Sequence, residues 1–126
     1  FDWTTKLVEI YKSASSKIIK IAIFRILLQM IKISSTQIVK SKQILGLIQE
    51  NIWGSDQILK ATSTLIFTHI VQSFSSNGLD FWFVGVDIQT IYDNFEKCIV
   101  TDPLTATYSV GLLTELLKQA DSTLSM

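Results

Sequence analysis

The 126-residue sequence contains only one cysteine and one histidine. A single cysteine excludes an intramolecular disulfide framework. Together with the lack of an Asn-x-Ser/Thr acceptor, it favours a reducing, intracellular compartment, either cytoplasmic or nuclear. A metal site built on imidazole usually needs two or more histidines. We therefore interpret His69 as a histidine at the edge of the core with local hydrogen bonds, and Cys98 as a small buried hydrophobic residue.

Proline and glycine are also scarce, with one and five residues respectively. These numbers are too small for the many turns of an all-β sandwich. The glycines form neither a Gly-x-Gly-x-x-Gly motif nor a Walker motif, so no phosphate-binding loop is indicated. Asp93 and Glu96 form the only close carboxylate pair, on a face that is predicted to be exposed, without the apolar setting that acid–base catalysis needs. The sequence predicts a protein that is not an enzyme, with no cofactor and no metal.

Charged residues make up only 17% of the chain, whereas hydrophobic residues make up 48%. Because the usual charged fraction is about 25%, this composition argues against disorder. It also suggests that more than one face of the fold is covered by a neighbour, a partner or lipid. We expect residues 1–126 to form a single all-helical domain or a fragment of a larger helical-repeat protein. The absence of an initiator methionine suggests a processed or excised chain.

Hydrophobic residues recur at helical spacing along most of the chain. The pattern predicts six helices at about residues 2–14, 16–33, 36–53, 55–74, 88–100 and 103–119. Short connections favour antiparallel neighbours, so the fold is predicted to be all-α, with three antiparallel hairpins in a helical-repeat array or a compact bundle. Gly46, inside the third helix, is expected to mark the close approach of another helix. Gly54 is expected to end that helix in the left-handed conformation.

The sixth helix has the clearest start in the chain, with a capping Asp102 followed by proline at the first helical position. Its residues resemble the first helix of a HEAT or armadillo-type repeat, through Asp102-Pro103-x-Thr105-Ala106, Val110, Leu112-Leu113 and Leu116-Leu117. The resemblance covers residues 102–117 and otherwise only the layout of the helices. It implies a scaffold that binds other macromolecules on a helix-lined face, not an enzyme.

The predicted helix at residues 16–33 is apolar nearly all round. We exclude a membrane span, because each charge near the centre of a bilayer costs about 2.5–3.5 kcal/mol. A helical projection predicts a polar half with Lys17, Lys20, Arg25, Gln29 and Lys32, into which Ile21, Phe24 and Leu28 intrude. It predicts a buried half formed by Ile19, Ile23, Ile26, Leu27, Met30 and Ile33. A basic amphipathic helix lying on an anionic membrane surface is an alternative, and binding to the phosphates of nucleic acid is a weaker one.

Charge is distributed unevenly along the chain. Residues 1–60 contain nine Lys/Arg and four Asp/Glu, whereas residues 61–126 contain two and seven. One interpretation is head-to-tail packing, in which the basic half of one copy or neighbour meets the acidic half of the next. The other is a basic surface for phosphate groups or for an acidic partner.

Residues 78–87, GLDFWFVGVD, interrupt the helical pattern with three consecutive aromatic residues. If this segment is extended, both of its sides are apolar, so it is either buried between helices or available to a partner. Aromatic residues are enriched among interface anchors, and they can also line a pocket for an apolar ligand. The candidate partner-binding residues are therefore Phe81, Trp82, Phe83, Lys17, Lys20, Arg25 and Lys32.

These patterns together predict a non-catalytic protein–protein interaction or scaffold module that is part of a larger assembly. The alternative is a small helical carrier of lipid or of another apolar ligand.

Overall fold

The structure is a computed structural model that describes residues 3–34, 38, 40–77 and 88–124. Within these residues the chain forms six helices and no strand. They are α1 (Trp3–Ser13), α2 (Lys17–Ile33), α4 (Lys42–Ile52), α5 (Gln57–Asn77), α6 (Ile88–Thr101) and α7 (Pro103–Leu124). The predicted all-α fold of three antiparallel hairpins is confirmed.

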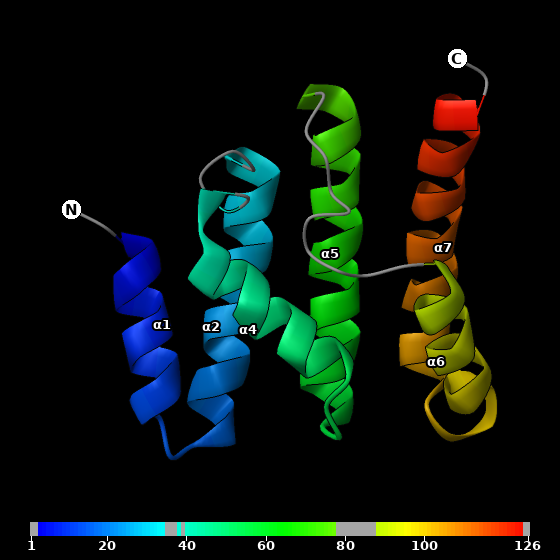
Figure 1. The fold of residues 1–126 in the computed structure, drawn as a ribbon. Helices are drawn as coiled ribbons and strands as arrows, with labels where there is room; N and C mark the ends of the chain where they lie inside the picture. Colours follow the sequence, from blue (N-terminus) through cyan, green and yellow to red (C-terminus); the bar gives the residue numbers. More distant parts are fainter. Residues whose placement is uncertain (1–2, 35–37, 39, 78–87, 125–126) are drawn as a thin grey trace.

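The helices are arranged so that α1, α2, α5 and α7 stand side by side, with α4 crossing in front of α2 and α5 and with α6 in front of α7 (Figure 1). Helices α2, α5 and α7 run in the same direction, and α5 packs against both α2 and α7. Helix α4 packs against α5 and α1, and α6 packs against α7. The hairpins therefore follow one another in space in the same order as in the sequence.

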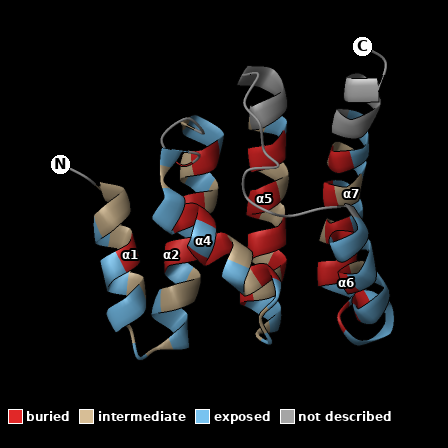
Figure 2. Ribbon diagram, in the orientation of Figure 1, coloured by how far each residue is buried: buried red, intermediate tan, exposed pale blue. Residues whose placement is uncertain are grey.

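One cluster of buried side chains runs through all six helices, and α5 lies at its centre. The middle of α5 contributes Ile66, Phe67, Ile70 and Val71, all fully buried. Figure 2 shows buried residues concentrated along α5, whereas α6 and the lower half of α1 are largely exposed. Because burying each large apolar side chain contributes about 1.5–3 kcal/mol, this shared core holds the three hairpins together.

Side-chain caps fix the starts of several helices. Asp56 Oδ1 accepts a hydrogen bond from the N–H of Leu59 at 2.9 Å, and this cap confirms the predicted start of α5. The predicted start at residue 36 lies outside the described residues, but the predicted continuous helix over 36–53 is wrong, because α4 begins after Ser41, which accepts a hydrogen bond from the N–H of Ile44 at 3.3 Å. Serine competes for backbone groups in this way and therefore favours helix starts.

Helix α7 continues to Leu124, beyond the predicted end at about residue 119. No glycine or proline follows residue 111 to stop the helix, so the last turns continue the same hydrogen-bonding pattern.

Both glycine predictions in the second hairpin are wrong. A Cβ atom added at Gly46 would have nothing within 4 Å, so no other helix approaches closely there. Helix α4 ends with Trp53 as its C-cap, and Gly54 does not adopt the left-handed conformation. Instead, the Gly54 N–H donates to the carbonyl oxygen of Asn51 at 3.1 Å, in a tight turn.

Alanine substitution at Gly46 or Gly111 is expected to raise the free energy of unfolding by about 0.5–1 kcal/mol each. Both glycines occupy exposed positions inside helices, and a Cβ atom at either position meets no other atom within 4 Å. Urea denaturation followed by circular dichroism measures the gain. Gly54→Ala is the control without a gain, because its Cβ would lie 3.3 Å from the carbonyl oxygen of Asn51. A loss of stability in both helical variants would contradict the described packing.

The predicted buried face of α2 is confirmed at Ile23 and Leu27 but is otherwise displaced by a fraction of a turn. Phe24 is fully buried, with 0% exposure, although the projection placed it on the polar side. Ile19, Ile26 and Ile33, which were predicted to be buried, are exposed. Helix α2 packs against α1 and α5, so the directions of those two neighbours decide which side is covered. No helix among the described residues is long and apolar enough to cross a membrane.

Helix α7 shows a similar shift. Ala106, Val110, Leu113 and Leu117 are spaced as one apolar row, which predicts that they are buried, but the side chains of Val110 and Leu117 are exposed. The buried positions are instead Thr105, Ala106, Ser109, Leu112 and Leu116. Small side chains dominate the first half of this buried face and suit the close packing of α7 against α5 and α6.

Candidate functional site

The seven residues predicted to bind a partner fall into two groups. Phe81, Trp82 and Phe83 lie outside the residues that the structure describes. The four basic residues, Lys17, Lys20, Arg25 and Lys32, all lie on α2. The structure separates them further, because Lys17 and Lys20 have partners on other helices, whereas Arg25 and Lys32 form no salt bridge with a described residue.

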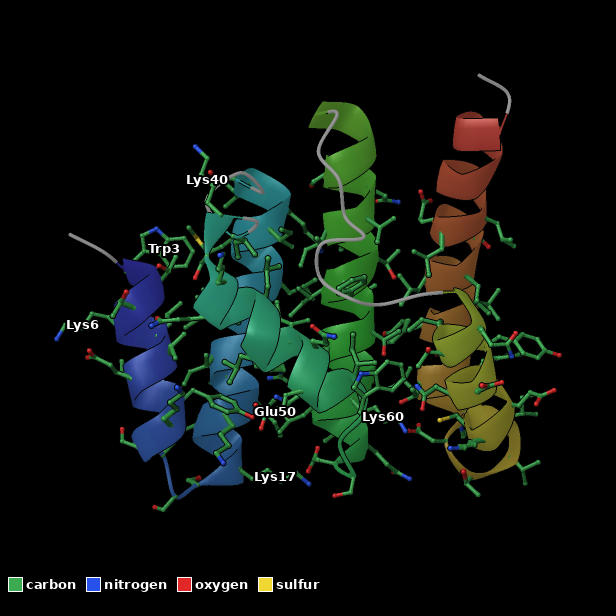
Figure 3. All side chains as sticks on the ribbon, viewed as in Figure 1. Trp3, Lys6, Lys17, Lys40, Glu50 and Lys60 are labelled. Atoms are coloured by element: carbon green, nitrogen blue, oxygen red, sulfur yellow. The ribbon has the colours of Figure 1, made fainter. Side chains whose placement is uncertain are left out.

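Lys17 forms an ion pair with the cap of α5. Its Nζ lies 2.6 Å from Asp56 Oδ2, and Figure 3 shows Lys17 at the lower end of α2, directed toward the start of α5. Burial acts to raise the pKa of the Asp56 carboxyl, but the hydrogen bond from Leu59 N–H and the charge of Lys17 outweigh it. The pKa therefore lies below its ordinary value of 3.8. The ion pair between Lys17 and Asp56 therefore links the first turn of α2 to the start of α5.

Lys20 belongs to a contact among three helices. Its Nζ lies 5.1 Å from the ring centroid of Tyr11 on α1, within the range of a cation–π interaction. The Tyr11 ring stacks on Phe24 of α2 at a centroid distance of 5.5 Å. The Tyr11 hydroxyl donates a hydrogen bond to Asn51 Oδ1 of α4 at 3.2 Å. Lys20 therefore contributes to packing within the fold, as Lys17 does.

Arg25 and Lys32 lie seven residues apart on the exposed side of α2 and form no salt bridge with another described residue. Isoleucines surround them, and two are unusually exposed: Ile18 at 78% and Ile33 at 79%. We call this surface the outer face of α2. It consists of Ile18, Ile19, Ala22, Arg25, Ile26, Gln29, Lys32 and Ile33, all of which are exposed. The face therefore combines positive charge with apolar side chains left in water.

A second exposed surface combines negative charge with apolar side chains. We call it the outer face of α6. It consists of Gln89, Tyr92, Asp93, Glu96, Ile99 and Val100, all of which are exposed. Val100 is 88% exposed. Gln89 Nε2 donates to Asp93 Oδ1 at 2.9 Å. The hydrogen bond to Glu96, and then the charge of Glu96, raise the pKa of the Tyr92 hydroxyl.

The outer face of α6 was not predicted, because helical spacing places Tyr92 and Ile99 in one apolar row with Ile88, Ile91 and Phe95. Ile91 is buried as expected, whereas Tyr92 and Ile99 lie on the exposed side with the carboxylates. Tyr92 precedes Phe95 by three residues and Glu96 by four, so at helical spacing it lies between an apolar residue and an acidic one. A residue at the border between an apolar row and an acidic row can belong to either side.

The residues that could take part in catalysis or metal binding have the exposure that the sequence predicted. Cys98 is buried and is not in a disulfide, and both Asp93 and Glu96 are exposed. His69 is half-buried on α5. Burial lowers the pKa of its imidazole, the charge of Lys32 lowers it further, and a hydrogen bond with Gln72 partly opposes them. In the part of the chain that is described, no group of three or more His, Cys, Asp and Glu residues could hold a metal ion.

The pKa of His69 is expected to lie below 6.5 and to rise in a Lys32→Gln variant, because removal of the nearby positive charge favours the protonated imidazole. His69 is the only histidine, so its imidazole proton resonances are assigned without ambiguity in an NMR titration. Lys12→Gln on α1 is the matched control and should leave the pKa unchanged. An unchanged value in Lys32→Gln would show that α2 and α5 do not pack as described.

The same shift predicts how stability depends on pH. The folded state binds fewer protons than the unfolded state when the pKa of a histidine is lowered by folding. The contribution of His69 to the free energy of unfolding is therefore complete above pH 6.5 and is lost as the pH falls through the folded pKa. A His69→Gln variant should lack this part of the pH dependence.

Comparisons with known proteins give no relative for this arrangement: no protein-family model matches the chain, and no curated protein or solved structure matches it either.

Proposed function

We propose that the chain is a non-catalytic, intracellular interaction module that binds an acidic, partly apolar protein surface through the outer face of α2. The observation that carries this proposal is the exposure of Ile18 and Ile33 beside Arg25 and Lys32. Exposed apolar patches with a polar rim are typical of interaction sites.

Physical chemistry supports a protein partner for this face. Moving each exposed isoleucine out of water contributes up to about 1.5–3 kcal/mol, and Arg25 and Lys32 would steer the approach of an acidic surface. The opposite side of α2 is anchored in the core through Ile23, Phe24 and Leu27, so the face is held in place by the fold. A rigid face of this kind loses little conformational entropy on binding.

The resemblance of residues 102–117 to a HEAT or armadillo-type repeat agrees with a scaffold role. The hairpins lie beside one another in sequence order, which is the layout of helical-repeat scaffolds. The alternative role as a carrier of an apolar ligand stays a prediction from composition.

Cross-linking in native extract tests this proposal with two variants of the outer face of α2. Arg25→Glu/Lys32→Glu reverses its charge, and Ile18→Ser/Ile33→Ser removes its apolar contacts. Each variant is expected to recover partners at least about tenfold less efficiently than the wild type, which corresponds to about 1.4 kcal/mol of binding free energy. Thermal unfolding of each variant checks that the fold is intact.

Lys6→Glu/Lys12→Glu on the neighbouring α1 is the matched control, because it makes the same change in net charge away from the outer face of α2. It should recover partners as the wild type does. The proposal is overturned if the two α2 variants recover the same partners as the wild type. It is also overturned if the face binds anionic vesicles and no protein, as a membrane-surface helix would.

A further inference from the structure

Net charge changes steadily along the three hairpins. Residues 3–33, which contain α1 and α2, carry six Lys/Arg and one Asp/Glu. Residues 42–77, with α4 and α5, carry two of each, and residues 88–124, with α6 and α7, carry two Lys/Arg and five Asp/Glu. Because the hairpins lie in sequence order, the basic and acidic hairpins are at opposite ends of the described fold.

Each of the two end hairpins also carries an exposed surface that combines apolar side chains with charges of that hairpin's sign. The outer face of α2 places Arg25 and Lys32 beside exposed isoleucines, and the outer face of α6 places Asp93 and Glu96 beside Tyr92, Ile99 and Val100. The two faces are therefore complementary in charge, and both have apolar area to bury. Contact between two α2 faces, or between two α6 faces, would bring like charges together and is disfavoured.

We propose that the partner of the outer face of α2 is a second copy of this chain, which binds through the outer face of its α6. This inference rests on the proposed function and names the partner of the same site. The two surfaces are different, so the contact is heterologous, and a pair keeps one unused outer face of α6 on one copy and one unused outer face of α2 on the other. Association therefore continues head to tail into a ring or an open chain.

The expected association is weak and sensitive to salt. One helix face on another buries less than the roughly 1,600 Å² of a standard stable interface, and association also costs translational and rotational freedom. Attraction between the charged faces is screened as the Debye length falls from about 10 Å at 0.1 M salt to about 3 Å at 1 M. The weight-average mass of the wild type should therefore rise with concentration and fall with added salt.

Sedimentation velocity on the 126-residue chain provides the first test. The protein concentration is raised to about 1 mM, because weak complexes dissociate below that range. Sedimentation of a monomer at every concentration at low salt would overturn the proposal. A weight-average mass that rises no further than a dimer would also overturn the proposal, with one exception. A closed ring of two copies uses both faces of each copy, so such a dimer must be lost when either face alone is changed.

Charge reversal provides the sharper test. Arg25→Glu/Lys32→Glu reverses one face, and Asp93→Lys/Glu96→Lys reverses the other. Each variant alone should sediment as a monomer, because its two faces now carry the same sign. An equimolar mixture of the two variants should associate again, as should a single chain that carries all four changes. Lys6→Glu/Lys12→Glu is the control that should retain association.

The rescue separates recognition from a general loss of folding, since an unfolded variant cannot be rescued by a second charge reversal. Failure of the mixture to associate overturns the proposal, and so does persistent association of either variant alone. If self-association fails while the α2 variants still lose partners in extract, the proposed function stands and only the identity of the partner is wrong. If self-association holds and no other protein is captured, this chain is the partner.

Discussion

Replacement of Phe24 with alanine is expected to lower the free energy of unfolding by about 3–5 kcal/mol. Phe24 is fully buried in the shared core, so truncation removes a large apolar side chain and leaves a cavity. The ring also stacks on Tyr11, whose hydroxyl donates to Asn51. The loss therefore affects the contact at which α1, α2 and α4 meet.

Ile26→Ala is the matched comparison on the same helix, and it is expected to cost about 1 kcal/mol or less. Its side chain is 46% exposed, so much of its surface remains in water in the folded protein. Urea denaturation of both variants, followed by circular dichroism, measures the difference. A larger loss in Ile26→Ala than in Phe24→Ala would support the buried face predicted from sequence over the one in the structure.

Asp102→Ala is expected to have the second-largest effect and to lower the free energy of unfolding by about 2–4 kcal/mol. Asp102 is buried at the start of α7, where Oδ1 accepts from the Thr105 N–H at 3.2 Å and Oδ2 accepts from the Thr105 hydroxyl at 2.6 Å. Loss of a side-chain cap costs about 0.5–2 kcal/mol. The buried Thr105 hydroxyl would also lose its partner, which costs about a further 1–3 kcal/mol.

A double-mutant cycle separates these two contributions. Thr105→Val keeps the shape of the side chain and removes the hydroxyl, so Asp102→Ala should cost less in a Thr105→Val background than in the wild type. Ser41→Ala removes an N-cap with only one side-chain bond and is expected to cost about 1 kcal/mol. If Asp102→Ala costs no more than Ser41→Ala, the pair with Thr105 does not stabilise the fold as described.

Local chemistry allowed the starts of α5 and α7 to be predicted, because a capping side chain and the N–H that donates to it lie within a few residues of each other. Asp56 and Asp102 both accept from the N–H three residues later, as their positions suggested. Ser41 was missed because the hydrophobic pattern continues across it from Ile38 to Ile44. Periodicity indicates a helix there, but a single serine can end one helix and begin the next.

The side of each helix that is buried could not be predicted to the same degree. Helix α2 is apolar nearly all round, so composition does not distinguish its core side from its exposed side. The placement of Phe24 inside and Ile26 outside depends on where α1 and α5 lie, and those positions follow from the tertiary fold. In α7, likewise, Leu112 and Leu116 are buried whereas Leu117 is exposed.

In the candidate site, too, the sequence predicted some features, whereas others depend on the tertiary fold. The sequence identified the basic residues of α2, and two of them, Arg25 and Lys32, lie on the exposed face. Lys17 and Lys20 were placed with them, but their partners Asp56 and Tyr11 belong to other helices. A contact between residues far apart in the sequence cannot be inferred from helical spacing alone.

The order of the hairpins has a consequence for how the chain acquires its structure. Each helix packs mainly against the helices of its own hairpin and of the next one, so a hairpin can dock as soon as its neighbour has formed. Helical bundles fold in microseconds to milliseconds. The first two hairpins can therefore collapse around α5 while the third is still being synthesised, and α7 then docks onto a preformed surface.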